Sequence, residues 1–179
     1  MSGEVPERLK RDELDAGFFL GDIRDFDAGA GLAVEGREQL FQVKELARLT
    51  YRVVGPPFLA GVILGRDWTS LAALPWIGTP YASVHNRLLA RLFAELGVRH
   101  NVVASVDQEA SMVAMVRTGV GLSLSLCRES IALHEQQANG LVIADRVKVD
   151  TALSFVCLNA RALDPSIAHA FDVIHRVWG

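Results

Sequence analysis

The side chains that could hold a small molecule lie where predicted strands end and predicted helices begin. Thr79 and Ser83 stand between a short apolar strand and a helix, and Gln108 follows another strand. Ser125 closes a third strand. In open parallel sheets, ligands collect beyond the carboxyl ends of the strands, where the amino ends of helices offer free N–H groups. These groups could bind a small anion, or Thr79, Ser83 and Asp107 could simply cap their own helices.

A glycine pair suggests a nucleotide site, but its context argues against one. Gly119-Val120-Gly121 resembles the start of a dinucleotide fingerprint, whose glycines allow a tight turn and close approach to a pyrophosphate. Leu124 occupies the place of the third glycine. The pair also follows a predicted helix and opens a strand, which reverses the required order. No Gly-Lys-Ser or Gly-Lys-Thr triplet of a phosphate-binding loop is present.

The sequence contains no recognisable set of metal ligands and no activated nucleophile. The five histidines are scattered singly, without His-Glu-x-x-His or Cys-x-x-Cys spacing. No Gly-x-Ser-x-Gly turn presents a serine. Ser123 and Ser125 share one face of a predicted strand, either as part of a lightly polar sheet face or as part of a ligand site. We therefore expect no metal, no cofactor and no catalysis.

The composition favours a globular α/β protein of the cytoplasm. Half of the residues are hydrophobic but only 7% are aromatic, so the core must be mainly aliphatic. The net charge of −3 provides no field that would attract DNA to this chain. There are two cysteines, Cys127 and Cys157, and we find neither a signal-peptide core nor a membrane span.

Predicted strands and helices alternate through the middle of the chain, which is typical of a largely parallel sheet. Ser83 and Asp107 are the predicted caps of two helices, which Gly97 and Gly119 end. Two further strands are expected near the end, over 141–144 and 153–158. The apolar run 14–21 is predicted as a buried parallel strand. The other predicted strands cover 48–54, 75–80, 102–106 and 122–126. The predicted helices cover 5–9, 83–97, 107–119, 128–137 and 165–178, and 68–74 is a short helix or turn.

Four segments, in this order, resemble the effector-binding domain of LysR-type transcriptional regulators. Glu13-Leu14-Asp15-Ala16-Gly17-Phe18 is similar to a Gly-x-Leu-Asp-hydrophobic signature, and Trp68 to Ile77 is similar to the entry to the second lobe. Met112 to Leu122 resembles a Val-x-x-Gly-x-Gly-hydrophobic segment, and the closing helix also fits. The resemblance implies a two-lobed α/β fold of the periplasmic-binding-protein type 2, with Rossmann-like lobes.

The resemblance also implies how the lobes are divided and what they do. The first lobe would be formed by 1–60 and 155–179 and the second by 61–154, with a small, anionic effector in the cleft between them. Binding would be transmitted by rearrangement of a homo-oligomer, a dimer or tetramer, and DNA would be bound by a domain that this chain lacks. The implied effector contacts are Leu20, Gly21, Thr79, Tyr81, Ser83, Gln108, Ser125 and Leu126.

The sequence departs from the family pattern in three places. Asp12-Glu13 stands where the family has a glycine, and Leu126 replaces a usual proline. The family's winged helix-turn-helix, linker helix and first strand–helix–strand do not precede Val5, so the first lobe is expected to be incomplete. Two alternatives stay open: a solute-binding module with the same lobes, which would need an export signal, and a small α/β hydrolase, which would need a buried nucleophile beside a base.

Overall fold

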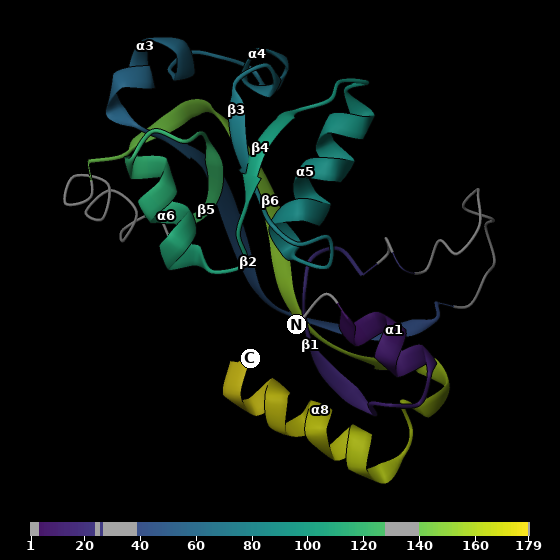
Figure 1. Cartoon of the computed structure of the whole chain (residues 1–179). Coiled ribbons are helices and arrows are strands. Elements are labelled where there is room, and N and C mark those ends of the chain that lie inside the picture. Colours follow the sequence, from purple (N-terminus) through teal and green to yellow (C-terminus); the bar gives the residue numbers. More distant parts are fainter. Residues whose placement is uncertain (1–3, 24–25, 27–38, 128–139, 179) are drawn as a thin grey trace. The chain divides into compact units, whose positions relative to one another are not determined.

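The computed structural model describes residues 4–23, 26, 39–127 and 140–178. The chain divides into two compact units. The terminal unit comprises 1–48 and 151–179, and the central unit comprises 49–150. Two long strands, β2 (Phe41–Gly55) and β6 (Val142–Leu158), continue from one unit into the other (Figure 1).

The terminal unit is built on part of a four-stranded sheet with the order β1-β6-β2-β5, to which it contributes β1, the end of β6 and the start of β2. Its elements are α1 (Val5–Lys10), β1 (Ala16–Leu20), η3 (Asn159–Arg161) and α8 (Pro165–Trp178). In the pairing of β1 with the end of β6, Ala16 lies opposite Cys157 and Leu20 opposite Leu153. The predicted helices at both ends are confirmed. The prediction that the first strand is parallel is wrong, because an apolar run reveals burial but not the direction of the partner strand.

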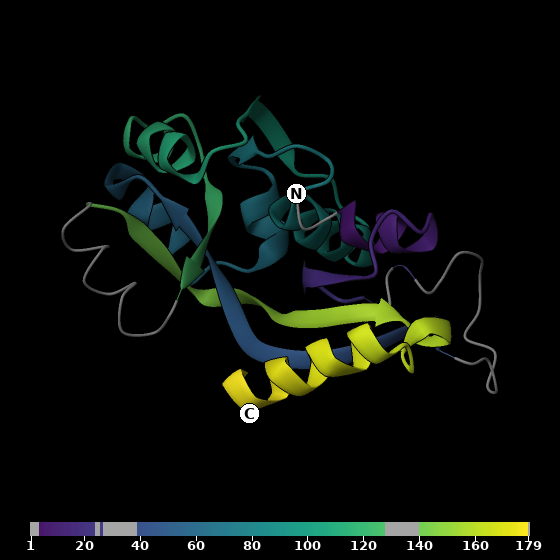
Figure 2. The same cartoon turned by 90° about the horizontal axis from the view of Figure 1, so that it is seen from below.

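Apolar side chains from distant parts of the sequence form the core of the terminal unit. The helix α8 runs alongside this unit's share of β2 and β6, where Phe171 contacts Phe155 with ring centroids 4.9 Å apart (Figure 2). The buried cluster of the unit consists of Leu9, Phe19, Ile23, Phe41 and Val156.

The central unit mixes parallel and antiparallel pairing. Its elements are η2 (Pro57–Leu59), α3 (Ala60–Ile63), α4 (Trp68–Ala72), β3 (Pro75–Gly78), α5 (Val84–Glu95), β4 (Asn101–Ser105), α6 (Glu109–Arg117) and β5 (Ser123–Cys127). The strands β3 and β4 are parallel, and Leu122 forms a parallel bridge with Trp76. The strand β5 then pairs antiparallel with β2. The predicted largely parallel sheet is therefore wrong for β1 and β5, although the alternation of strands and helices was predicted correctly.

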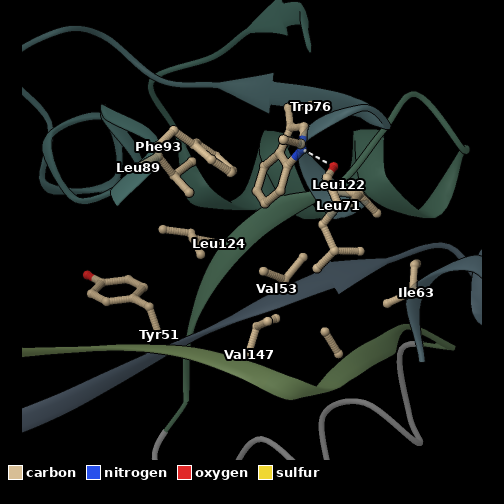
Figure 3. Packing of buried hydrophobic residues seen from close by; sticks show 12 residues of the cluster. Tyr51, Val53, Ile63, Leu71, Trp76, Leu89, Phe93, Leu122, Leu124 and Val147 are labelled. Atoms are coloured by element: carbon tan, nitrogen blue, oxygen red, sulfur yellow. Dashed lines mark hydrogen bonds between the residues drawn. The ribbon is translucent and has the colours of Figure 1, made fainter. Parts of the chain in front are cut away.

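Trp76 is the largest fully buried side chain in the core of the central unit. It is fully buried, and its indole Nε1 donates a hydrogen bond to the Leu71 carbonyl at 2.8 Å (Figure 3). Its ring meets Phe93 edge to face, at 5.8 Å between centroids. Val53 and Leu124, which are opposite each other in the β2–β5 register, are also fully buried in this cluster. This one cluster therefore contains side chains from the strands β2, β3 and β5 and from the helices α4 and α5.

The glycine segment serves packing. Gly119 has a φ of +88°, which favours glycine, and a Cβ there would lie 2.7 Å from the Phe58 ring. At Gly121 a Cβ would lie 2.6 Å from the Pro75 carbonyl oxygen. Both glycines permit close approach, of an aromatic ring in one case and of a backbone strand in the other.

Several predicted boundaries are wrong for a common reason. The strand β2 begins at Phe41 instead of residue 48, and β6 is one strand where two were predicted. Charged residues such as Glu45 and Asp145 interrupt the apolar pattern of these strands, because their side chains face solvent while the backbone stays paired. The helix predicted over 128–137 lies outside the described residues.

Candidate functional site

Hydrogen bonds tie the segment between β3 and α5 to the first turn of α5. The Thr79 and Ser83 hydroxyls lie 2.5 Å apart, and Ser83 Oγ accepts from the Asn86 N–H at 3.1 Å. The amide of the Asn86 side chain donates to the Thr79 carbonyl at 3.2 Å. Ser83 is thus the N-cap of α5, as the sequence predicts. Tyr81, between these residues, is 87% exposed.

Two backbone N–H groups at the start of α5 have no hydrogen-bond acceptor among the described residues. Within the described residues no acceptor pairs with the N–H of Val84 or His85, whereas the next two amides bond to Ser83. Unpaired amides at the amino end of a helix of 12 residues can bind an anion. The two readings of Thr79 and Ser83, as caps and as parts of an anion site, are therefore compatible.

The start of α6 differs from the prediction. Gln108, not Asp107, occupies the N-cap position, and its side chain makes no capping hydrogen bond. The prediction that Asp107 caps this helix is wrong, because the helix begins one residue later than the pattern suggests. Gln108 is exposed and Glu109 places a carboxylate in the first turn. This helix end is consequently less suited to a highly charged anion than that of α5.

The two predicted contacts on β5 point to opposite faces. Leu126 lies opposite Tyr51 and packs against the central cluster, whereas Ser125 lies opposite Arg52. Ser123, on the Ser125 face, is buried and its hydroxyl donates to the Ile77 carbonyl at 3.3 Å. Ser123 is thereby a structural residue, and the side chains of Ser125 and Leu126 lie on different sides of the strand.

Leu20 and Gly21 belong to the terminal unit, at the end of β1. Gly21 has a φ of +139°, a conformation that other residues rarely adopt, and its N–H donates to the Ala152 carbonyl at 3.0 Å. Leu20 is half-buried and lies opposite Leu153. Of the eight predicted contacts, the structure brings Thr79 and Ser83 into direct contact.

Sequence reasoning missed Tyr51 and His85. Tyr51, on β2, is 3% exposed, and its ring meets the His85 ring edge to face at 4.9 Å between centroids. Burial, aided by the charge of Glu109, raises the pKa of Tyr51 to about 12, while Arg87 opposes the rise. Burial lowers the pKa of His85. Both side chains are therefore neutral near pH 7, and no motif in the sequence indicates that they meet.

A separate groove of about 480 Å³ lies at the other end of α5. Its lining includes Phe93, Arg99 and His100, and the His100 ring stacks on Phe93 at 4.8 Å. None of the eight predicted residues lines it. Among residues 4–23, 26, 39–127 and 140–178, no group of His, Cys, Asp and Glu could hold a metal ion. Every helix in that part of the chain is too short or too polar to span a bilayer.

The family model of the LysR substrate binding domain matches residues 1–179, which is the whole chain. The chain belongs to this family. The predicted resemblance is confirmed, and with it the α/β fold of the periplasmic-binding-protein type 2 that LysR substrate-binding domains share. Members of the family are effector domains of transcription regulators.

Solved structures of regulatory domains have the same fold as this LysR-family chain. The effector-binding domain of QuiR in complex with shikimate has a TM-score of 0.65 at 19% identity, over 98% of this chain and 77% of that one. The regulatory domain of Synechocystis PCC6803 CcmR in complex with 2-PG has a TM-score of 0.66 at 15% identity, over 99% and 79%. Full-length CbnR complexed with its target DNA matches at 0.61 and 16% identity, over 100% and 57%. Comparison with curated protein sequences finds no match.

Proposed function

We propose that this chain is the ligand-sensing domain of a cytoplasmic LysR-type transcription regulator and that it binds a small organic anion without transforming it. The single observation that carries the proposal is the pair of unaccepted N–H groups of Val84 and His85, beside the Thr79 and Ser83 hydroxyls. Amides and hydroxyls at a helix amino end stabilise a negative charge. Similar domains bind shikimate in QuiR and 2-PG in CcmR, which supports a small ligand.

The other six predicted effector contacts also belong to the proposal, but other observations support them. Gln108 and Tyr81 are exposed polar residues near helix starts, and Ser125 and Leu126 lie within β5 of the same unit. Leu20 and Gly21, in the terminal unit, rest on the family resemblance alone. We also keep the proposed lobes, 1–60 with 155–179 and 61–154, and transmission of binding by a homo-oligomer that reaches DNA through a separate domain.

Titration of the protein with shikimate, benzoate and inorganic phosphate tests the proposal. We expect at least one of these anions to shift the backbone amide resonances of residues 79–85. Thr79→Val removes one hydroxyl while Ser83 still caps α5, so the affinity should fall roughly 2- to 12-fold, the effect of one hydrogen bond. The midpoint of urea unfolding should change little.

Ser111→Ala is the matched control, because Ser111 carries an exposed hydroxyl in the first turn of α6 and is none of the eight predicted effector contacts. It should leave both affinity and stability unchanged. The proposal is wrong if none of the three anions perturbs the amides of 79–85, or if Ser111→Ala weakens binding as much as Thr79→Val.

A further inference from the structure

The position of Tyr51 connects several of the proposed effector contacts. In the antiparallel β2–β5 register Tyr51 lies directly opposite Leu126, so that both side chains lie on one face of the sheet. Its ring also contacts His85, the second residue of α5. Figure 3 shows the Tyr51 ring at the margin of the buried cluster, with the hydroxyl directed away from the other labelled side chains.

The Tyr51 hydroxyl has no hydrogen-bond partner in the part of the chain that the structure describes. Thr151 Oγ1 is the fully buried side-chain polar atom left unpaired among the described residues, so the Tyr51 hydroxyl retains some surface. A phenol whose ring is buried usually finds a partner for its O–H group. Tyr51 therefore presents an unused donor at the end of an otherwise apolar ring.

Charged groups near the phenol define which ligand it would accept. Arg87 in the first turn of α5 and Glu109 at the start of α6 both act on Tyr51 electrostatically. Arg87 and the unaccepted amides of α5 favour one negative charge. The carboxylate of Glu109 makes a second negative charge unfavourable. The surroundings thus suit a singly charged carboxylate better than a doubly charged phosphate.

We infer that Tyr51 is a specificity-determining residue whose phenolic hydroxyl donates a hydrogen bond to the carboxylate of a small organic acid held at the amino end of α5. This inference rests on the proposed function. It adds a residue from the long strand β2 and a ligand class, the monocarboxylates. Burial keeps the phenol protonated, since the pKa of Tyr51 is raised to about 12, so the donor persists across the physiological range.

The chain offers a direct reporter for this contact, because Tyr51 and Tyr81 are its two tyrosines. Protein labelled with 3-fluorotyrosine should give two ¹⁹F resonances, and the spectrum of Tyr51→Phe assigns the one that remains to Tyr81. Addition of shikimate or benzoate should shift the Tyr51 resonance. Tyr51→Phe, which keeps the buried ring, should bind the same acid roughly tenfold more weakly or worse, as expected for a hydrogen bond to a charged group.

Ser111→Ala again serves as the control and should bind as the unaltered protein does. The inference is overturned if the acid shifts the amides of 79–85 while the Tyr51 resonance and the affinity of Tyr51→Phe stay unchanged; the proposed function would then stand. Tighter binding of inorganic phosphate than of either acid overturns the ligand class. If none of the three anions perturbs 79–85, the proposed function fails and this inference with it.

Discussion

At the scale of single residues, the central unit combines neutral polar groups with buried rings. Tyr51 and His85 meet edge to face, and His100 stacks on Phe93 at the far end of α5. Burial lowers the pKa of both histidines below their usual value of 6.5. In the unfolded chain the pKa of both histidines would return to 6.5, so protonation of these histidines favours unfolding.

The pH dependence of stability should report these two histidines. As the pH falls through about 6.5, the unfolded chain takes up protons that the folded chain does not, so the free energy of unfolding should fall between about pH 7.5 and about pH 5.5. Asp67, Asp145 and Asp150, whose pKa values are lowered by hydrogen bonds, stay ionised in this window. Urea unfolding at the two pH values measures the effect.

Substitution at the half-buried His85 tests this assignment, with the exposed His169 as the comparison. His85→Gln should remove part of the fall in stability, because glutamine does not titrate, and His100 should still contribute to the fall that remains. His169→Gln, at an exposed position on α8, is the control for the substitution itself. An unfolding free energy that does not change over this pH range, or a full fall in His85→Gln, would contradict the assignment.

At the scale of elements, close approach of backbones positions the site. Leu122 N–H donates to the Pro75 carbonyl at 2.8 Å, and the Ile77 N–H donates to the Leu122 carbonyl at the same distance. Gly121 precedes this bridge and has no room for a Cβ. The same bridge orders β3, which leads into the Thr79 to Ser83 loop, and β5, which carries Leu126.

Gly121→Ala should therefore destabilise the protein by about 1–3 kcal/mol, because the new Cβ would lie 2.6 Å from the Pro75 oxygen and a strand would have to move. Gly61→Ala in α3 is the matched control, since nothing lies within 4 Å of its Cβ position. Alanine is the better helix former, so the control should be neutral or stabilised by up to about 1 kcal/mol. Equal urea midpoints for the two variants would refute this account.

At the scale of the whole molecule, charge bears on what the chain binds. With 18 basic and 21 acidic residues the net charge is −3, and Lys and Arg residues are paired with carboxylates at several surface positions, such as Arg91 with Glu95 at 2.9 Å. Arg161 lies 2.6 Å from Asp15 and 3.0 Å from Asp164. A surface of this kind does not neutralise a phosphate backbone.

The chain by itself should accordingly not bind duplex DNA at about 0.15 M salt. Fluorescence anisotropy of a short labelled duplex, titrated with the 179-residue chain, measures this. The anisotropy should stay constant. The same protein sample should still bind whichever of shikimate, benzoate and inorganic phosphate it binds without DNA. A saturable rise that weakens steeply with salt would show a basic surface that the charge distribution does not predict.

The sequence by itself determined the alternation of elements, the cap at Ser83, the last helix and the family, because caps, helical periodicity and ordered motifs are local signals. It did not determine strand direction, the extent of β2 and β6, or the start of α6. The direction and extent of a strand depend on its partner strand and on which of its charged side chains face solvent. The position of Tyr51 against His85 and opposite Leu126 was decided by the tertiary structure alone, because these residues are far apart in the sequence and only strand register and helix packing bring them together.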